Sequence, residues 1–367
     1  MRNDKYMKTK AVIHKGYKPI YDSAEGLICW RKGSLYLVKA ETRQKICSCP
    51  MNGLHKLFVR FRLLERIFRL SPRCAAKEPN GNIVFSMHGG LYSLDLKKKA
   101  LSLQHKFITG MNNPLMISMV EGIEGFEDGL YYGEYVPKQT NREVSIWKKT
   151  HGEWEVCFRF QPNEITHIHG IIPDPYHKGL LILTGDLDSE SAIWLAEKNF
   201  NHVMKIKGGK QRYRACVAVP TEKGIFYATD DPFEQNKIRL LIRQGNSWEE
   251  QEISDLPGTV LYADYNEQRI LFSCTVEPDS TKSGIRYLLT CSLASGIQDN
   301  FVRVFRFDLK TFLLEEQLRV PKDMLPGGLA QFGSAMFAAK DKGIDRTVVY
   351  FTSVQRWDNA YTVLEEK

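Results

Sequence analysis

Two histidines that could bind one ion or one sugar stand two residues apart, at His167 and His169. The residues after them are largely apolar or β-branched and predict a strand, so both side chains should emerge on the same face. This pattern is compatible with a metal site, for which Glu134, Asp186 or His88 would be the completing ligands. It is also compatible with a general base beside a hydrogen-bond donor to substrate, or with structural hydrogen bonds, which suit His169 best.

Carboxylates that could act as acid, base or cation ligand follow several strand-like apolar runs. Asp186, Asp230 and Glu134 occupy equivalent positions in three of these runs. If they lie side by side, their repulsion would raise a pKa, bind a cation or require a nearby arginine. Together with His167, these three acids are our candidates for catalytic residues. Hydrolysis of a glycoside would need Asp186 paired with Glu134 or Asp230 at a characteristic separation.

Two arginines, Arg73 and Arg214, begin strand-like runs on the face where these acids are expected. Forked guanidinium groups suit a carboxylate or a phosphate, and the formal net charge of +8 also favours an acidic ligand. One of Tyr132, Tyr135 and Tyr213 is expected to offer a sugar ring a stacking face. The candidates for substrate binding are Arg73, Arg214, His88, Tyr213 and Glu277.

The candidate residues recur at the ends of short runs that are typical of β-strands. Counted from His88 through Glu134, Asp186, Asp230 and Glu277, the spacing is 46, 52, 44 and 47 residues, close to the period of propeller blades. Seven such runs divide the 367 residues into periods of about 52 residues. The runs cover residues 26–31, 82–89, 129–135, 179–186, 224–231, 269–277 and 346–354.

Within a period, four strand-like segments alternate with turns rich in glycine and proline, which predicts an all-β fold. We expect a single domain over residues 1–367, a seven-bladed β-propeller of four-stranded antiparallel blades. The last period lacks its outer strand, and residues 10–15 could supply it and remove the exposed edges. The start of the inner strand and the end of the second strand share one face of a blade. The candidate residues should therefore converge at one mouth of the central channel.

The period, the four-strand pattern and two Gly-plus-Trp turns resemble the sialidase-like, Asp-box class of β-propellers. Gly245 and Trp248 match the end of its S-x-D-x-G-x-x-W turn, with Arg243 at the Asp position. Gly152 and Trp154 form the other turn, with a spacing one residue shorter. The resemblance covers nearly the whole chain and implies a carbohydrate-active propeller.

The histidine pair is similar to that of the oligogalacturonate lyases, seven-bladed propellers with histidine metal ligands. This resemblance rests on His167 and His169 and implies a divalent metal ion as cofactor. We expect the protein to bind, and to cleave or modify, an acidic glycan at the mouth of the channel.

Two reaction types stay open for such a protein. One is glycoside hydrolysis. The other is a lyase in which a cation neutralises the uronate carboxylate while His or Tyr removes the α-proton. The alternative is a non-catalytic propeller, a scaffold of a membrane-associated system that makes surface polysaccharide. The sequence leaves open whether the chain is an enzyme.

One segment departs from the strand pattern. Residues 54–70 place apolar side chains at helical spacing with basic residues mostly away from them, which predicts an inserted basic amphipathic helix. This helix would either pack on the propeller, or meet an anionic membrane surface or a partner through Arg62, Arg66 and Arg69. Its arginines accompany an apolar stripe better suited to lipid than to nucleic acid, so no nucleic-acid partner is expected.

The composition is that of a folded globular protein, with 43% hydrophobic and 26% charged residues, and it excludes disorder and collagen-like structure. The sequence offers neither a signal-type apolar segment nor a stretch long enough to span a bilayer. We therefore expect a cytoplasmic protein, peripheral at the inner membrane face if the helix docks there. The eight cysteines are expected to be reduced, including the close pair Cys47 and Cys49.

Overall fold

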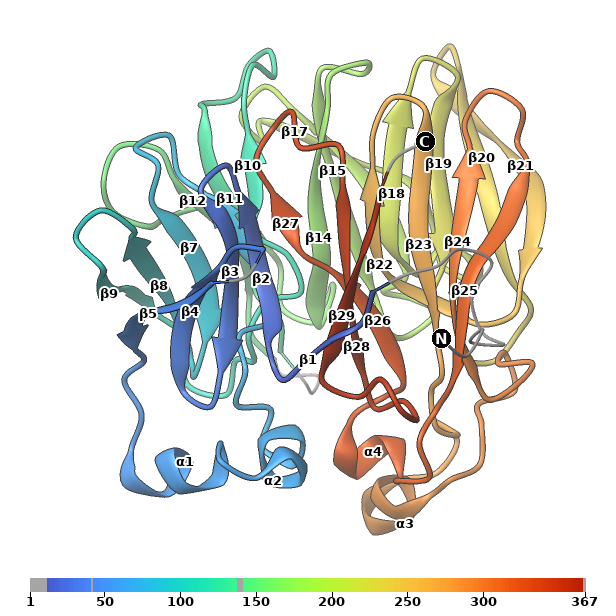
Figure 1. Cartoon of the computed structure of the whole chain (residues 1–367). Coiled ribbons are helices and arrows are strands. Elements are labelled where there is room, and N and C mark those ends of the chain that lie inside the picture. Colours follow the sequence, from blue (N-terminus) through green and yellow to red (C-terminus); the bar gives the residue numbers. More distant parts are fainter. Residues whose placement is uncertain (1–11, 41, 137–140, 366–367) are drawn as a thin grey trace. The chain divides into compact units, whose positions relative to one another are not determined.

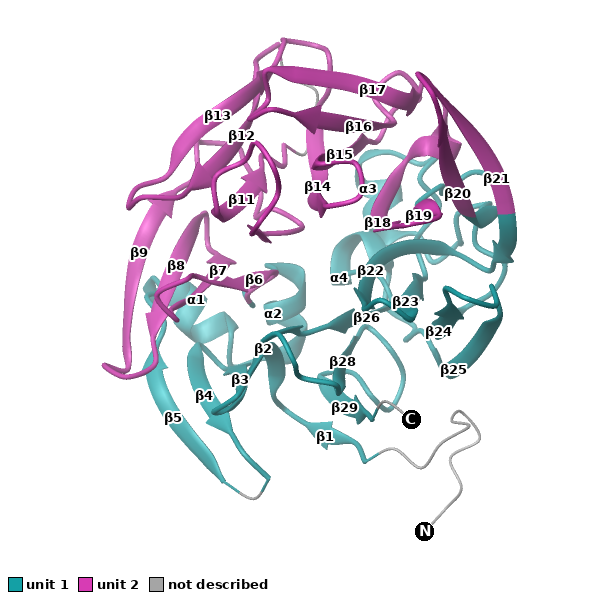
Figure 2. Cartoon of the chain, turned by 90° about the horizontal axis from the view of Figure 1, so that it is seen from above, with its two compact units in different colours: residues 1–71, 230–238, 253–367 teal, residues 72–229, 239–252 magenta. Residues whose placement is uncertain are grey.

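The computed structural model describes residues 12–40, 42–136 and 141–365, whose strands form seven sheets (Figure 1). The predicted fold class is confirmed: a seven-bladed β-propeller of four-stranded antiparallel blades. The chain divides into two compact units (Figure 2). Unit 1 comprises the described residues up to Ser71 with 230–238 and 253–365, and unit 2 comprises those of 72–229 and 239–252. The expectation of one domain over the whole chain stays a prediction.

Unit 2 holds three complete blades and most of a fourth, each with its strands in chain order. Blade 2 consists of β6 (Ala75–Lys77), β7 (Ile83–Met87), β8 (Gly90–Asp95) and β9 (Ala100–Lys106). Blade 3 consists of β10 (Ser118–Val120), β11 (Gly129–Gly133), β12 (Val144–Lys149) and β13 (Glu155–Phe160). Blade 4 consists of β14 (His167–Asp174), β15 (Gly179–Gly185), β16 (Ala192–Glu197) and β17 (His202–Gly208). Blade 5 consists of β18 (Ala215–Thr221), β19 (Gly224–Thr229), β20 (Asn236–Gln244) and β21 (Ser247–Leu256), the last two extending into unit 1.

Unit 1 holds three blades, of which the last is completed from the N-terminal side of the chain. Blade 1 consists of β2 (Lys18–Ser23), β3 (Gly26–Arg31), β4 (Ser34–Val38) and β5 (Arg43–Ser48), with β27 (Ala339–Lys340) added beside β2. Blade 6 consists of β22 (Thr259–Tyr265), β23 (Arg269–Thr275), β24 (Phe301–Asp308) and β25 (Leu314–Pro321). Blade 7 consists of β26 (Ser334–Phe337), β28 (Thr347–Thr352), β29 (Ala360–Leu364) and β1 (His14–Lys15). His14 pairs with Tyr361, which confirms the N-terminal outer strand, but only over His14–Lys15: residues 12 and 13 are not part of it, and residues 10 and 11 lie outside the described residues.

In blades 2 to 7 the second strand is the most deeply buried one. Every residue of β7, β11, β15, β19, β23 and β28 is buried. These strands are paired on both edges and covered on both faces, as where Ile182 and Trp194 of blade 4 pack with Ile146 and Phe160 of blade 3. Such strands are therefore continuous apolar runs, and they are the runs from which the blade period was predicted.

The predicted single helix over residues 54–70 is wrong. The segment forms two short helices, α1 (Gly53–Phe58) and α2 (Arg62–Ile67), separated by a turn. The side chain of Asn52 caps α1 by accepting a hydrogen bond from the His55 amide at 2.8 Å. Two further short helices, α3 (Gly284–Leu289) and α4 (Gly327–Ala330), belong to the same unit. No helix in the described ranges is long and apolar enough to cross a membrane.

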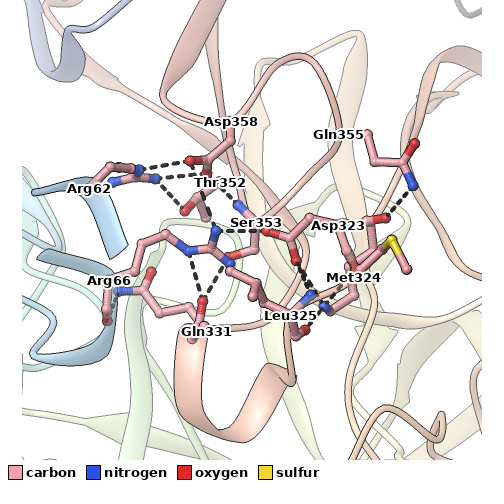
Figure 3. A network of polar contacts seen from close by, with 12 residues as sticks. Arg62, Arg66, Asp323, Met324, Leu325, Gln331, Thr352, Ser353, Gln355 and Asp358 are labelled. Carbon is pink, nitrogen blue, oxygen red and sulfur yellow. Dashed lines mark hydrogen bonds and ion pairs between the residues drawn. The ribbon is translucent and has the colours of Figure 1, made fainter. Parts of the chain in front are cut away.

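The arginines of α2 point into unit 1 (Figure 3). Arg62 donates two hydrogen bonds to the carboxylate of Asp358, both of 2.9 Å. Arg66 is 4% exposed and donates to Asp323 at 2.7 Å and to the backbone oxygen of Ala330 at 2.9 Å. The expectation that Arg62 and Arg66 contact a membrane or partner is therefore wrong, because unit 1 itself engages their guanidinium groups.

Candidate functional site

Polar side chains from four blades of unit 2 meet in one cluster. The contributing positions are those that start a first strand or follow a second strand, as the blade geometry predicts. The side chains involved are Arg73 before β6, Tyr135 after β11, His167 and His169 on β14, Asp186 after β15, and Arg214 before β18. We call His167, His169, Asp186 and Arg214 the Asp186 cluster.

Hydrogen bonds to the backbone fix the tautomers of both histidines. Nδ1 of His167 lies 3.0 Å from the Val136 carbonyl oxygen, and Nδ1 of His169 lies 2.9 Å from that of Ala215. A carbonyl oxygen only accepts, so each Nδ1 carries a hydrogen and donates it. In the neutral rings each Nε2 then presents a lone pair, and the two Nε2 atoms are 3.0 Å apart. The two lone pairs repel each other unless a proton or a metal ion lies between the rings.

Asp186 supplies a negative charge beside the two facing nitrogens. Its carboxylate oxygens lie 3.4 Å from Nε2 of His167 and 3.5 Å from Nε2 of His169, and Arg214 contacts the same group at 3.1 Å. Burial alone would raise the pKa of Asp186. The charge of Arg214 and the hydrogen bonds of the histidines outweigh that cost and hold the pKa well below its usual range. Asp186 is therefore a carboxylate at neutral pH.

The two histidines differ from Asp186 in their exposure. Each imidazole is 2% exposed, whereas the Asp186 side chain is 44% exposed. Burial lowers the pKa of His169, and the hydrogen bond with Asp186 opposes that shift. A neutral imidazole next to an accessible carboxylate is the form in which these two kinds of group bind a metal.

The donor set fits a divalent cation. One atom each from His167, His169 and Asp186 lie within 4.8 Å of one another. Nitrogens bound to one ion at about 2.0–2.1 Å lie about 2.8–3.4 Å apart for right-angled or tetrahedral directions, a range that includes the separation of the two Nε2 atoms. Metal-binding histidines also commonly donate their other nitrogen to a backbone carbonyl, as both rings do here.

Two glycines allow the strands to approach closely at the cluster. A Cβ atom on Gly185 would lie 2.8 Å from Cε1 of His169 and 3.1 Å from Cγ of Arg214. A Cβ atom on Gly133 would lie 2.4 Å from the Ile168 side chain, between β11 and β14. Any larger residue at either position would displace the histidine strand or its neighbours.

An arginine and a tyrosine continue the site beyond the cluster. The Tyr135 ring lies 4.3 Å from the His167 ring, and the Arg73 guanidinium lies over Tyr135 at 5.1 Å. Arg73 donates to the backbone oxygen of Asn113 at 3.1 Å and forms no ion pair within the described part of the chain. Burial raises the pKa of Tyr135, so its hydroxyl keeps its proton. Arg73 is thus a cation open to an anionic ligand.

Several predicted site residues lie elsewhere. Glu134 turns along its own blade, where it accepts hydrogen bonds from the Ser145 amide and Trp147 Nε1 at 3.1 Å each and from Arg142 at 3.2 Å. Tyr213 accepts a hydrogen bond from Arg212 at 2.7 Å, whereas the tyrosine that lies beside His167 is Tyr135.

The other three candidates come from three different blades. His88 follows β7 in blade 2 and is partly buried. Asp230 and Glu277 belong to unit 1, where Asp230 is buried and Glu277 accepts a hydrogen bond from Thr259 at 2.7 Å.

The sequence analysis missed Gln211 and the two backbone carbonyls that orient the histidines. Gln211 lies in a short 3₁₀ turn before β18 and donates from Nε2 to the Asp186 backbone oxygen at 2.7 Å. Its buried Oε1 atom has no hydrogen-bond partner among the residues the structure describes. The basic, glycine-containing turn before it gave no signal for this role, and no side-chain pattern reveals the carbonyls of Val136 and Ala215.

Comparison with known proteins supports the fold. No family model and no curated protein sequence matches the chain. An oligogalacturonate lyase from Vibrio parahaemolyticus is similar in structure, with a TM-score of 0.53, 13% identity, and coverage of 96% of this chain and 91% of the lyase. The WD40 β-propeller domain of Doa1 has a TM-score of 0.52 and 11% identity, with coverage of 99% and 98%. At such identities the likeness shows the propeller fold alone, and the more specific sialidase-like assignment gains no support.

Proposed function

We propose that the Asp186 cluster binds a divalent cation and that the protein uses it to bind and modify an acidic sugar. The observation that carries this proposal is the pair of buried imidazoles whose Nε2 atoms lie 3.0 Å apart while both Nδ1 atoms donate to carbonyls. Such a pair needs a proton or a metal ion between the rings, and the adjacent Asp186 carboxylate offers a metal ion a third ligand.

The roles follow from the contacts. His167, His169 and Asp186 would hold the cation, and Arg214 orients the Asp186 carboxylate. A bound divalent cation would supply Lewis-acid stabilisation of negative charge on a uronate. Arg73 offers its guanidinium to a carboxylate of the sugar, and Tyr135 offers a protonated hydroxyl next to it.

Elimination fits the site better than hydrolysis. Hydrolysis would use two carboxylates across the scissile bond, but Glu134 is buried and occupied by three donors from blade 3. The cation cluster requires only one carboxylate, Asp186. The similarity in fold to a lyase adds modest support, because that lyase is named for an acidic oligosaccharide.

Metal analysis and thermal unfolding test the cation site. Purified wild type and His167→Ala are stripped with a chelator and titrated with Mn²⁺, Zn²⁺, Mg²⁺ or Ca²⁺. His202→Ala is the matched control, because His202 is an exposed histidine of the same unit and pairs with Glu197. We expect one cation to stabilise wild type and the control by about 2.7 kcal/mol at a hundredfold excess over its dissociation constant, and His167→Ala to lose this gain. Equal responses of all three proteins, or none in wild type, would contradict the proposal.

A second assay tests the acidic sugar. Oligogalacturonate and the neutral maltooligosaccharide are compared for binding and for an unsaturated product, which absorbs in the ultraviolet. Wild type should bind only the acidic sugar, and Arg73→Gln should bind it at least tenfold more weakly while keeping the cation-induced stabilisation. Equal binding of both sugars would contradict the role of Arg73, and binding without an unsaturated product would contradict elimination.

A further inference from the structure

The short helices of unit 1 turn apolar side chains outward. Five of these residues on α1, α2 and the adjoining turns are between 47% and 65% exposed: Leu54, Leu57, Phe61, Leu63 and Phe68. We call them the helical face. A helix that only packs on its own protein would bury its apolar side, whereas the buried residues of α2 are the charged Glu65 and Arg66. The orientation is therefore the reverse of that of an ordinary surface helix.

The ion pairs of α2 explain this orientation. Arg62 and Arg66 are held by Asp358 and Asp323 (Figure 3). Glu65 accepts hydrogen bonds from Trp30 Nε1 at 2.7 Å and from Arg62 at 3.0 Å. Because the charged side of α2 is fixed inside unit 1, its other side is presented to the surroundings. These polar contacts are therefore the reason why apolar side chains of α2 are exposed.

The exposed charges of the segment 52–70, which carries the helical face, all have one sign. Lys56, Arg60 and Arg69 are exposed, and none of them forms an ion pair with another described residue. Glu65, the one acidic residue of the segment 52–70, is buried. This segment therefore combines exposed Leu and Phe with unneutralised cations and has no exposed carboxylate of its own, a pattern complementary to an anionic lipid surface.

A second set of exposed apolar residues belongs to the same helical assembly of unit 1. α4 contacts α2 through the Ala330 oxygen that accepts from Arg66, and it contacts α3 so closely that a Cβ on Gly328 would lie 2.5 Å from the Tyr287 oxygen. Figure 1 shows the four helices at one end of this unit. The exposed side chains of α3 and the loop before α4 are Ile285, Leu288, Leu289, Met324 and Leu325, with Arg286 as a further exposed cation.

We propose that the helical face docks unit 1 on an anionic lipid bilayer, with Leu57 and Phe61 inserted among the lipids and Lys56, Arg60 and Arg69 at the headgroups. A bilayer accounts for both the exposed Leu and Phe side chains and the cations around them. Its lipid tails can surround the apolar side chains while its anionic headgroups pair with the cations. This proposal does not depend on the cation site of unit 2.

Vesicle sedimentation tests the docking. The full chain is mixed with vesicles of phosphatidylcholine and with vesicles of equal parts phosphatidylcholine and phosphatidylglycerol. Wild type should sediment only with the anionic vesicles, and added salt should weaken the binding. The triple variant Lys56→Gln, Arg60→Gln, Arg69→Gln should bind on the order of 100-fold more weakly at low salt. Leu57→Ser with Phe61→Ser should bind at least about tenfold more weakly.

Matched controls separate the helical face from general charge and hydrophobicity. Lys97, Lys98 and Lys99 form an exposed basic turn of unit 2, and their triple Gln variant should bind like wild type. Leu313→Ser removes an equally exposed leucine of unit 1 and should also have no effect. Equal binding to both kinds of vesicle, or equal losses in the controls, would overturn the proposal. Self-association of wild type that is abolished by the Leu57/Phe61 variant, without vesicle binding, would assign the face to a second copy of the chain and overturn it as well.

Discussion

Replacing Arg66 by methionine should lower the free energy of unfolding by about 2 kcal/mol. Removing one partner of a buried ion pair costs about 3–5 kcal/mol when the other is left uncompensated. In this variant Asp323 would keep two other donors. Lys322 donates to its carboxylate at 3.2 Å, and the Leu325 amide donates to it at 3.1 Å. The Ala330 oxygen similarly keeps the Ser353 hydroxyl at 3.1 Å. These remaining donors place the expected cost below that range.

Arg66 also has a buried hydrogen-bond donor that destabilises the native state, and the methionine variant would remove it. Nη2 of Arg66 is buried without a hydrogen-bond partner in the described part of the chain. An unsatisfied buried donor costs about 1–3 kcal/mol, and methionine has no such group while filling a similar volume. This relief is the second reason for an expected loss of about 2 kcal/mol instead of 4.

Urea unfolding followed by circular dichroism measures the effect on wild type, Arg66→Met and Arg60→Met. Arg60 is the matched control, because it is exposed and lies only six residues away on the same segment. Its variant should stay within about 0.5 kcal/mol of wild type. A loss below about 0.5 kcal/mol for Arg66→Met, or equal losses for both variants, would refute the claim that Arg66 fastens α2 to unit 1.

Two further predictions follow from the contacts. Gly185→Ala should abolish the cation-induced thermal stabilisation because its Cβ would press on His169, whereas Gly53→Ala, whose Cβ meets nothing within 4 Å, should leave it unchanged in the same titration. Burial alone would raise the pKa of Asp358, but hydrogen bonds and charge from Arg62 and Arg66 hold it below the ordinary value. A lowered carboxyl pKa stabilises the fold above the unfolded-state pKa, so the stability difference between wild type and Arg62→Met should be constant near neutral pH and shrink below about pH 4. A difference that grows on acidification in urea titrations would contradict this assignment.

The blade period could be predicted because the second strands are buried on both faces. The run 26–31 coincides with β3, and the run 179–186 extends one residue beyond β15. Strands with one exposed face gave weaker patterns, and β1 was expected over residues 10–15 but is assigned only to His14–Lys15 among the described residues. The fold was thus readable where burial leaves no room for polar residues.

The site could be predicted in outline but not in its final membership. Chain direction in a meander places the start of a first strand beside the end of a second strand, and this rule brought His167, Asp186 and Arg214 together correctly. It could not tell whether a residue at a strand end turns into the site or along its own blade. The Glu134 side chain turns along its own blade because Trp147 and Ser145 of the neighbouring strand donate hydrogen bonds to it.

The segment 54–70 shows another limit of prediction from the sequence. Helical spacing correctly separated apolar from basic residues in 54–70, but spacing alone does not say which side faces the protein. The partners that decide it, Asp323 and Asp358, lie more than 250 residues along the chain from Arg66 and Arg62. Long-range ion pairs therefore reversed an orientation that local pattern would assign by default.

The two proposals divide between the two units, which makes them separable by experiment. All ligands and supporting residues of the cation site lie in unit 2, whereas the helical face and the ion pairs that orient it lie in unit 1. Gly185→Ala should therefore lose the cation response and keep vesicle binding, and the Leu57/Phe61 variant should do the opposite. Because each variant alters only side chains of its own unit, a change in both readouts with either one would indicate that the two functions are coupled. The coupling between cation binding and vesicle binding would then need a structural explanation.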